Sequence, residues 1–440
     1  MSMKTYKYFR DPIYGFIEVD TRFLKIIDSP FFQRLRRIKQ LAFTNLVFHG
    51  AEHSRFGHSL GTYHLAKTVI ERIDPKGSRN DSYDEFYLAA LLHDIGHPPF
   101  SHAFETVIRE AYGYSHEDYT RAVIKNTEIG DFIKDIGINK DSVIKLIEGK
   151  YVEKPQLQYL NTLINSELDI DRMDFLLRDA YYCGVPYGKY DIERLLLSLQ
   201  VHNGEIVVQE KGRHAVETFI LSRFYMYTQV YTHHTRRAFD IMLKSIFTKD
   251  NFEKIAYPKP SEKDITRLPG YDDIWLWKEI QRISQDPVVG ADIAKILLKR
   301  EPIRMVVQRI AYADVESKLT DPIFSRIEGL ESFKEELAKG VGVEPRLIFF
   351  DKPWRDLPFE ERYRQYSSAR EEEAKSIKIC RRNGNIIDVA SDESSLAYHL
   401  SRKLAQVIRI YTINEKRLEL AELIEKRCPD LKDTIIRKTV

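Results

Sequence analysis

The stretch LLHDIGHPPFSH, residues 91–102, decides the fold expected for this chain. The apolar run that leads into it is typical of the end of a buried helix. His93 and Asp94 follow, and an adjacent polar pair is costly to bury unless it is hydrogen-bonded or bound to a metal. Gly96 and the two prolines after His97 then end the helix and turn the chain back. A lone His–Asp pair more often forms a hydrogen-bonded helix end than a metal site, so the neighbouring segments decide.

Two further segments extend the pattern toward a metal site. EHSRFGHSLG, residues 52–61, carries His58 just before a helix that we expect to begin near Leu60. ELDIDRMD, residues 167–174, carries Asp171 on an expected amphipathic helix. With His93 and Asp94, these residues offer two neutral nitrogens and two anionic oxygens. Such a set suits an octahedral divalent ion, namely iron, manganese, nickel or zinc, with two positions left for water and substrate.

The order of these residues, H…HD…D, resembles that of the HD-domain phosphohydrolases. The motifs of this chain also resemble those of the sterile-alpha-motif/HD deoxynucleoside triphosphate triphosphohydrolase and its microbial relatives. The similarity covers roughly residues 7–245, more than half of the chain. It rests on six motifs in the right order, at residues 11–15, 33–41, 53–61, 93–102, 169–174 and 223–237.

The resemblance implies that His58, His93, Asp94 and Asp171 bind the metal. It also assigns three more histidines to the active site, His97, His102 and His116. Cleavage at the α-phosphorus requires an acid that protonates the departing 5′ oxygen. The resemblance gives this role to His102, oriented by Glu105, where the close relative has Asp. His97 and His116 would then neutralise phosphate oxygens, and Mg²⁺ would accompany the substrate phosphates.

The same resemblance implies a binding site for a deoxynucleotide. Arginine is suited to phosphate because it binds in a bidentate manner. The resemblance assigns Arg55, Arg172 and Arg223 to the phosphates. It assigns Gln40 and Leu41 to contacts with the deoxyribose, and Asp179 and Tyr231 to the edge of the sugar. Phe175 departs from the family, where Tyr is usual, so one hydrogen bond to the substrate would be missing.

A second nucleotide site is implied near the start of the chain. Lys7, Asp28, Gln33 and Arg36 coincide with residues that hold a guanine-nucleotide activator at a subunit interface in regulated relatives. The alternative is that the basic residues of 33–39 form a solvated helix face. Activator binding would imply a homodimer or homotetramer.

The fold class that we expect is mainly α, with an all-helical HD catalytic core and a smaller C-terminal α+β domain. We place the catalytic domain at residues 1–335, with its motif core at 50–180, and the assembly or regulatory domain at 336–440. Helical periodicity is expected over residues 31–41, 63–73, 86–95, 104–111, 119–124, 168–182 and 216–247. A short strand is expected over 205–208. Beyond the boundary, strands are expected over 346–350, 376–380, 386–389 and 407–411, and helices over 395–405 and 415–426.

Charge, apolar runs and cysteine spacing narrow the classes of function that this chain can have. The chain has 68 Lys+Arg against 66 Asp+Glu, a formal net charge of +2, so no global basic field indicates nucleic acid. No window approaches the roughly 18 apolar residues of a membrane span. Cys183, Cys380 and Cys428 are far apart and form no CxxC motif, which indicates a reducing, cytoplasmic location.

Three hypotheses about function follow. The leading one is hydrolysis of dNTPs to deoxynucleoside and inorganic triphosphate. The second is a phosphodiesterase or phosphatase acting on other nucleotides. The third, which the charge balance does not favour, is a nuclease that binds nucleic-acid phosphates through Arg34, Arg36, Arg37 and Lys39.

Overall fold

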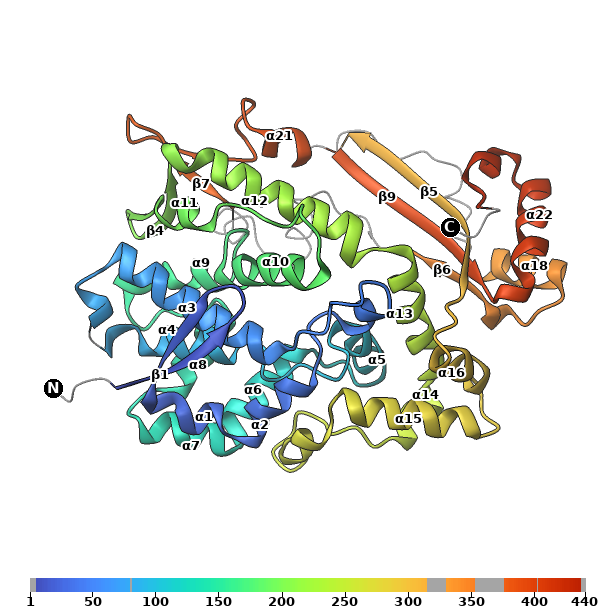
Figure 1. Ribbon diagram of the computed structural model, residues 1–440, viewed down its shortest axis with the longest axis horizontal. Coiled ribbons are helices and arrows are strands. Elements are labelled where there is room, and N and C mark those ends of the chain that lie inside the picture. Colours follow the sequence, from blue (N-terminus) through green and yellow to red (C-terminus); the bar gives the residue numbers. More distant parts are fainter. Residues whose placement is uncertain (1–4, 80, 315–329, 353–375, 402, 437–440) are drawn as a thin grey trace.

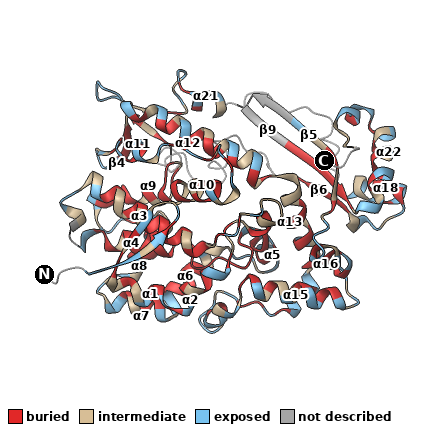
Figure 2. Cartoon of the chain, in the orientation of Figure 1, coloured by how far each residue is buried: buried red, intermediate tan, exposed pale blue. Residues whose placement is uncertain are grey.

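The computed structural model describes residues 5–79, 81–314, 330–352, 376–401 and 403–436. Helices make up most of the N-terminal part, and a smaller C-terminal region contains sheets (Figure 1), so the expected fold class is confirmed. The centre consists of α3 (Arg55–Ile73), α4 (Asp84–Leu92) and α10 (Ile170–Cys183), with α3 packed against both of the others. Figure 2 shows buried residues on the faces that these helices turn to one another.

Local sequence explains where the central helices begin and end. Eight of the nine residues of α4 are buried, all except Glu85, which agrees with its largely apolar sequence. In α10 the Asp169 side chain caps the first turn by accepting a hydrogen bond from the Arg172 N–H, and Gly184 ends the helix at a φ of 70°. Helix α3 begins at Arg55 and not near Leu60, so the expected start was wrong and His58 lies within the helix.

Further helices surround this centre. Helix α6 starts with a capping box formed by Ser115 and Asp118, which fixes His116 at its first position. The expected helix over 31–41 is wrong in its second half, because α2 stops at Arg34 and one 3-10 turn follows. The surrounding helices are α1 (Leu24–Ile27), α2 (Pro30–Arg34), α5 (His102–Tyr112), α6 (His116–Asn126), α7 (Glu128–Asp135), α8 (Lys140–Ile147), α9 (Leu160–Ile164) and α11 (Ile192–Leu196).

The long helix expected over 216–247 is divided. It consists of α12 (Arg213–Met226), a π-helical turn (Tyr227–Tyr231) and α13 (His234–Ile246). At the division the Thr232 N–H and hydroxyl both donate to the Tyr227 carbonyl oxygen, at 3.0 and 2.7 Å. The chain then continues through α14 (Lys249–Lys254), α15 (Asp273–Gln285) and α16 (Ala291–Leu298).

The strands form three sheets. An N-terminal hairpin pairs β1 (Tyr6–Asp11) with β2 (Gly15–Asp20). The second sheet has the order β3 (Leu199–His202), β4 (Glu205–Gln209), β7 (Lys378–Cys380) and β8 (Ile386–Asp388). The third has the order β5 (Arg304–Asp314), β9 (Lys403–Thr412) and β6 (Ile348–Asp351). Both larger sheets join segments from the two sides of the boundary expected at residue 335.

The third sheet lies at one side of the molecule, with α18 (Leu330–Val341) and α22 (Arg417–Arg427) beside it (Figure 1). These elements share a separate hydrophobic cluster that includes Val306, Leu337 and Ile408. The helix expected over 395–405 was too long, since α21 (Leu396–Ser401) ends before β9 starts at Lys403. Within the described residues, no helix is both long enough and apolar enough to cross a membrane.

Candidate active site

Four side chains from α3, α10 and the end of α4 meet at one point. His58 Nε2 lies 3.3 Å from His93 Nε2 and 2.9 Å from Asp171 Oδ1. Asp94 places its two oxygens 3.5 Å from the same two histidine nitrogens. The four residues predicted as metal ligands are therefore adjacent in space, although they come from segments more than one hundred residues apart.

The Nδ1 atom of each of the two histidines, His58 and His93, already makes a hydrogen bond. His58 Nδ1 donates to Asp174 Oδ2 at 2.8 Å, and His93 Nδ1 donates to the Ala90 carbonyl at 2.8 Å. In the neutral ring this arrangement leaves the lone pair on Nε2, the nitrogen that faces the other ligands. Metal-binding histidines almost always show such an outer hydrogen bond, because it fixes the tautomer and the ring orientation.

The electrostatics of this cluster also call for a cation. Burial alone would lower the pKa of His58, but hydrogen bonds and charges from Asp171 and Asp174 raise it to about 10. The pKa of Asp171, whose burial would raise it, is held well below its ordinary range by His58 and His93. Two carboxylates and two Nε2 lone pairs at one point fit a divalent ion, so the donor set agrees with a metal site.

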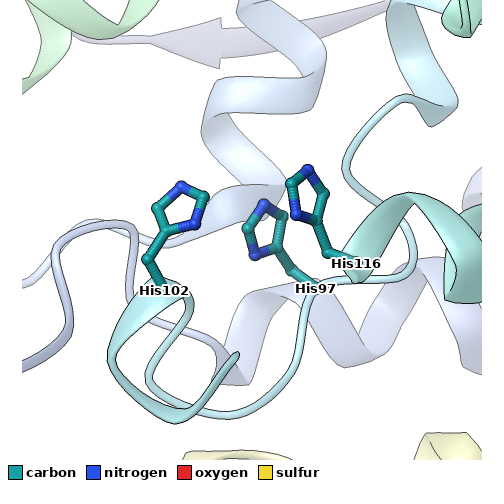
Figure 3. Close-up of side chains that lie close together, drawn as sticks. All are labelled: His97, His102 and His116. Carbon is teal, nitrogen blue, oxygen red and sulfur yellow. The ribbon is translucent and has the colours of Figure 1, made fainter. Parts of the chain in front are cut away.

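Three more histidines lie beside this cluster (Figure 3). Side-chain nitrogens of His97, His102 and His116 lie within 4.8 Å of one another. Glu105 accepts a hydrogen bond from His102 Nδ1 and another from His116 Nδ1, both at 2.8 Å. His97 contacts Asp94, with 3.2 Å between Nε2 and Oδ1, so the two groups of histidines are joined.

The geometry of the three histidines suits an anion better than a second metal. The rings of His97 and His116 are stacked, with centroids 4.1 Å apart and an interplanar angle of 17°. Ring nitrogens bind in the plane of the ring, and two nearly parallel rings direct those nitrogens side by side, not at one point. Side-by-side N–H donors match the separate oxygens of a phosphate group.

Most of these residues line one cavity of about 690 Å³, although His58 and Glu105 do not. Its wall includes His93, Asp94 and Asp171 as well as the three histidines of Figure 3. The predicted substrate contacts that line it are Gln40, Leu41, Arg55, Arg172, Phe175, Asp179 and Tyr231. The volume lies in the range of small-molecule sites.

Each arginine predicted to contact phosphate is paired with a carboxylate. Arg55 pairs with Asp94 and also donates to Ser101 Oγ at 2.8 Å. Arg172 pairs with Asp169. Arg223 pairs with Glu167 behind the cavity wall and is not one of the residues that line the cavity.

The predicted sugar contacts form their own hydrogen-bonded group. Tyr231 donates its hydroxyl to Asp179 Oδ2 at 2.7 Å, and His53 Nε2 lies 2.7 Å from the other oxygen of Asp179. Phe175 meets Tyr231 edge to face, with ring centroids 6.1 Å apart.

The residues predicted to bind an activator lie outside the cavity. Lys7 is exposed on β1, and Asp28 is exposed after α1. Gln33 Nε2 donates to the Ile27 carbonyl at 2.8 Å and accepts from Arg36 Nε at 2.8 Å. The Arg36 guanidinium lies 3.5 Å above the Phe56 ring. The structure thus gives Gln33 and Arg36 partners within this chain.

Sequence reasoning assigned no role to Asp174, although its spacing of three residues from Asp171 places both on one face of α10. It also missed one wall of the cavity, which α13 supplies. That wall consists of Arg236, Arg237, Asp240, Ile241 and Lys244. Their spacing of four residues on one helix face was a signal that could have found them.

Comparison with known proteins agrees with this site. The HD domain family matches residues 55–179, and the HD associated region matches residues 190–373. A Bacillus subtilis protein, YwfO, is 33% identical over 426 residues, which are 92% of each chain. This chain belongs to the HD-domain phosphohydrolase family.

Solved HD-domain relatives share the fold. An Aquifex aeolicus hypothetical protein has a TM-score of 0.73 at 30% identity, covering 95% of this chain and 99% of that one. A Bacteroides thetaiotaomicron phosphohydrolase has a TM-score of 0.71 at 25% identity, covering 93% and 100%. The Dictyostelium discoideum deoxynucleoside triphosphate triphosphohydrolase SAMHD1 homolog is 33% identical over 61% of this chain. That match covers 54% of the Dictyostelium protein, so this chain spans about half of its length.

Proposed function

We propose that this chain hydrolyses deoxynucleoside triphosphates to deoxynucleoside and inorganic triphosphate. The observation that carries the proposal is the composition of the single cavity described above. Its lining combines three of the four proposed metal ligands, three histidines suited to phosphate, and the Asp179–Tyr231 pair, which we assign to the sugar. The similarity to the Dictyostelium triphosphohydrolase supports the same substrate class.

In this proposal His58, His93, Asp94 and Asp171 hold the divalent ion. When bound, the ion supplies a nucleophilic water at neutral pH and polarises a phosphoryl oxygen. Arg55 and Arg172 then exchange part of their pairing with Asp94 and Asp169 for the oxygens of the triphosphate. Charge-assisted, bidentate contacts of this kind fix the phosphate orientation.

In this proposal His102 protonates the departing 5′ oxygen. Its ring is 63% accessible because it faces the open cavity, and Glu105 holds its Nδ1. The Nε2 atom is therefore the one turned to the substrate. Burial lowers the pKa of His102, and the hydrogen bond that its Nδ1 donates to Glu105 opposes that effect. An acid with a pKa near or below neutrality transfers its proton readily to an alkoxide leaving group.

In the same proposal His116 neutralises phosphate charge. Burial alone would lower the pKa of His116, but the hydrogen bond and the charge of Glu105 raise it above its ordinary 6.5. His97, stacked on His116, has its pKa lowered well below 6.5 by burial and by Arg55, and stays neutral. A cationic ring against a neutral one avoids the repulsion of two charged histidines in contact.

A guanine-nucleotide activator at Lys7, Asp28, Gln33 and Arg36 is the second part of the proposal. Gln33 and Arg36 lie together beside the Phe56 ring, and a nucleotide there would displace the Arg36–Gln33 hydrogen bond. Binding at that surface would act on the first turns of α3, which begin with Arg55 and contain His58. In the proposal, the active species is a homodimer or homotetramer.

The test is product analysis with each dNTP and with GTP, singly and mixed, in the presence of Mn²⁺ or Mg²⁺. Deoxynucleoside plus triphosphate is expected, with activity abolished in His93→Ala. Activity only in mixtures with a guanine nucleotide would support the activator site. Turnover of a generic phosphodiester without any dNTP turnover would favour the phosphodiesterase reading, to which the missing hydroxyl at Phe175 also points.

A further inference from the structure

Asp273, the first residue of α15, follows the histidine motifs by about 175 residues in the sequence. In the structure it is hydrogen-bonded to one of them, at Phe100. It is 5% exposed. Its Oδ1 accepts a hydrogen bond from the Phe100 N–H at 2.7 Å, and its Oδ2 accepts one from the Lys39 N–H at 2.9 Å. One buried carboxylate therefore joins two segments of the active site that are about 60 residues apart in the sequence.

The first of these segments has an unusual backbone. Phe100 and Ser101 both have a φ of 50°, and Ser101 has a ψ of −131°. Residues other than glycine rarely adopt this backbone conformation. Two such residues in a row persist only where surrounding contacts enforce the conformation. His102 follows directly as the first residue of α5, so the turn at 100–101 sets the direction in which His102 enters the cavity.

The second segment leads into another part of the cavity lining. Lys39 immediately precedes Gln40 and Leu41, which both line the cavity. Ser101 Oγ donates to the Lys39 carbonyl at 2.8 Å, so the two segments also touch each other. The position of Gln40 relative to His102 therefore depends on the contacts made at Lys39.

The segment just before α15 holds the same loop at a second place. Arg34 is fully buried, and its guanidinium donates to the carbonyls of His97 and Tyr271, both at 2.7 Å. Residues 271–273 are thus tied to the histidine loop at His97 through Arg34 and at Phe100 through Asp273. Neither tie involves a proposed metal ligand.

We propose that Asp273 is a positioning residue of this active site, which holds the strained Phe100–Ser101 turn against Lys39 and thereby sets His102 and Gln40 around the substrate. The inference rests on the proposed function, because it assigns Asp273 to the placement of the proposed acid. A carboxylate is required because both of its oxygens accept from N–H donors. An amide would turn its NH₂ group toward one of those donors.

The neighbouring residue provides a matched control. Asp272 caps α15 by accepting from the Trp275 N–H at 3.0 Å and pairs with Arg37, whereas the hydrogen bonds from the Phe100 and Lys39 N–H groups go to Asp273. Burial raises the pKa of Asp273 to about 6, so its carboxyl is ionised at neutral pH and both acceptors are present. Asp273→Asn and Asp272→Asn therefore remove equal charge at adjacent positions with different contacts.

The experiment compares the full-length variants by ¹⁵N-histidine NMR in the Zn²⁺ form and by steady-state kinetics with dNTP. In the wild type and in Asp272→Asn, His102 is expected to give one fixed tautomer, protonated at Nδ1. In Asp273→Asn the His102 signals should average over tautomers, while those of His58 stay fixed. The kcat should fall roughly 100-fold, the size of effect that a displaced catalytic group produces.

Three outcomes are decisive. If Asp273→Asn keeps the wild-type His102 tautomer and keeps kcat within about twofold, the proposal is wrong. If Asp273→Asn does not fold, Asp273→Glu, which keeps two acceptors one methylene farther out, is measured in the same way and judged by the same criterion. If the wild type turns over no dNTP, the proposed function fails, while the NMR comparison still decides the role of Asp273.

Discussion

Glu105 serves two histidines with one carboxylate. It accepts from Nδ1 of His102 and Nδ1 of His116, and also from the His116 backbone N–H at 2.9 Å. The sequence predicted only the contact with His102, because that histidine is three residues away on the same helix. The contact with His116 depends on the turn between α5 and α6, where Gly113 has a φ of 79°. No helical spacing encodes that turn.

Glu105→Gln should lower kcat about 100-fold and move the pH profile. Glu105 raises the pKa of His116, so its removal lowers that pKa and the cationic ring is lost at a lower pH. The alkaline limb of kcat/KM is therefore expected to move to lower pH. Pre-steady-state and pH-rate measurements with dNTP check this. Arg109→Gln, which removes an exposed partner of the same carboxylate, is the control, and equal profiles in both variants would contradict the prediction.

Asp174 is a second residue whose contact with the site the sequence did not predict. It accepts from His58 Nδ1 and from two nitrogens of buried Arg178, so the orientation of a metal ligand depends on an ion pair inside the protein. The spacing from Asp171 was visible in the sequence. The partner His58 was not, because it lies 116 residues away on another helix.

Asp174→Asn should weaken divalent-metal binding about 10- to 100-fold, the usual effect of removing an outer hydrogen-bond partner. The amide can still accept from His58 but cannot neutralise Arg178. Competition with a chromophoric chelator measures the change, using Mn²⁺ and Zn²⁺. Asp191→Asn, at the exposed start of α11, is expected to bind metal as the wild type does. Unchanged affinity in Asp174→Asn would show that Asp174 has no effect on His58.

At the scale of elements, the site depends on how closely α3 approaches α10. Gly61 makes that approach possible, because a Cβ there would lie 1.9 Å from Asp174 Oδ1 and 2.4 Å from Arg178 Nη2. Gly57, one turn earlier on α3, has only ordinary contact, with 3.5 Å from its added Cβ to Arg178 Nη1. The two glycines therefore have different reasons to be present.

Gly61→Ala should destabilise the protein by about 1–3 kcal/mol, the range for an overpacked core, and should also weaken metal binding. Gly57→Ala is expected to be neutral or to stabilise by up to about 1 kcal/mol, since alanine is the better helix former. Thermal unfolding and metal titration of both variants test this pair. Equal effects in the two variants would rule out close helix approach as the cause.

The sequence predicted most elements near the site and failed where backbone geometry departs from regular periods. The strands predicted over 376–380 and 386–389 are confirmed by β7 and β8, which pair antiparallel. The division of the helix at Thr232 was not, because α12 and α13 carry the same helical period on both sides. The sequence also placed 403–405 in a helix, whereas pairing with β5 draws these residues into β9. Long-range pairing is the information that a local pattern lacks.

At the scale of the whole molecule, the C-terminal sheet reaches the cavity wall through β9. Arg409 donates to the Thr232 carbonyl at 2.6 Å, and the Tyr411 hydroxyl donates to the His234 carbonyl at 3.1 Å. From β6, Asp351 accepts from Arg237 at 2.7 Å. The turn after Tyr231 is therefore held by residues more than 100 positions later in the chain.

Arg409→Met should raise the KM for dNTP roughly tenfold, which corresponds to a loss of about 1.4 kcal/mol. The reason is that the Thr232 carbonyl loses its buried donor and Tyr231 is no longer fixed. Metal content should stay at the wild-type level, because the metal ligands lie on other elements. Arg346→Met, which breaks a surface ion pair with Asp292, serves as control. A lower metal content in Arg409→Met would mean that the C-terminal sheet acts on the whole core.

The π-helical turn at Tyr227–Tyr231 affects which deletions this protein can tolerate during evolution. A π-helical turn holds one residue more than an α-helical turn, so it corresponds to a single inserted amino acid. Deleting any residue between 227 and 231 would leave too few residues for the wide turn, and the hydrogen bonds from Thr232 to the Tyr227 carbonyl would be lost. Tyr231 would then be displaced from Asp179 in one genetic step. Single-codon deletions in this segment should therefore be tolerated far less often than substitutions, and homologues of different length here should differ in substrate.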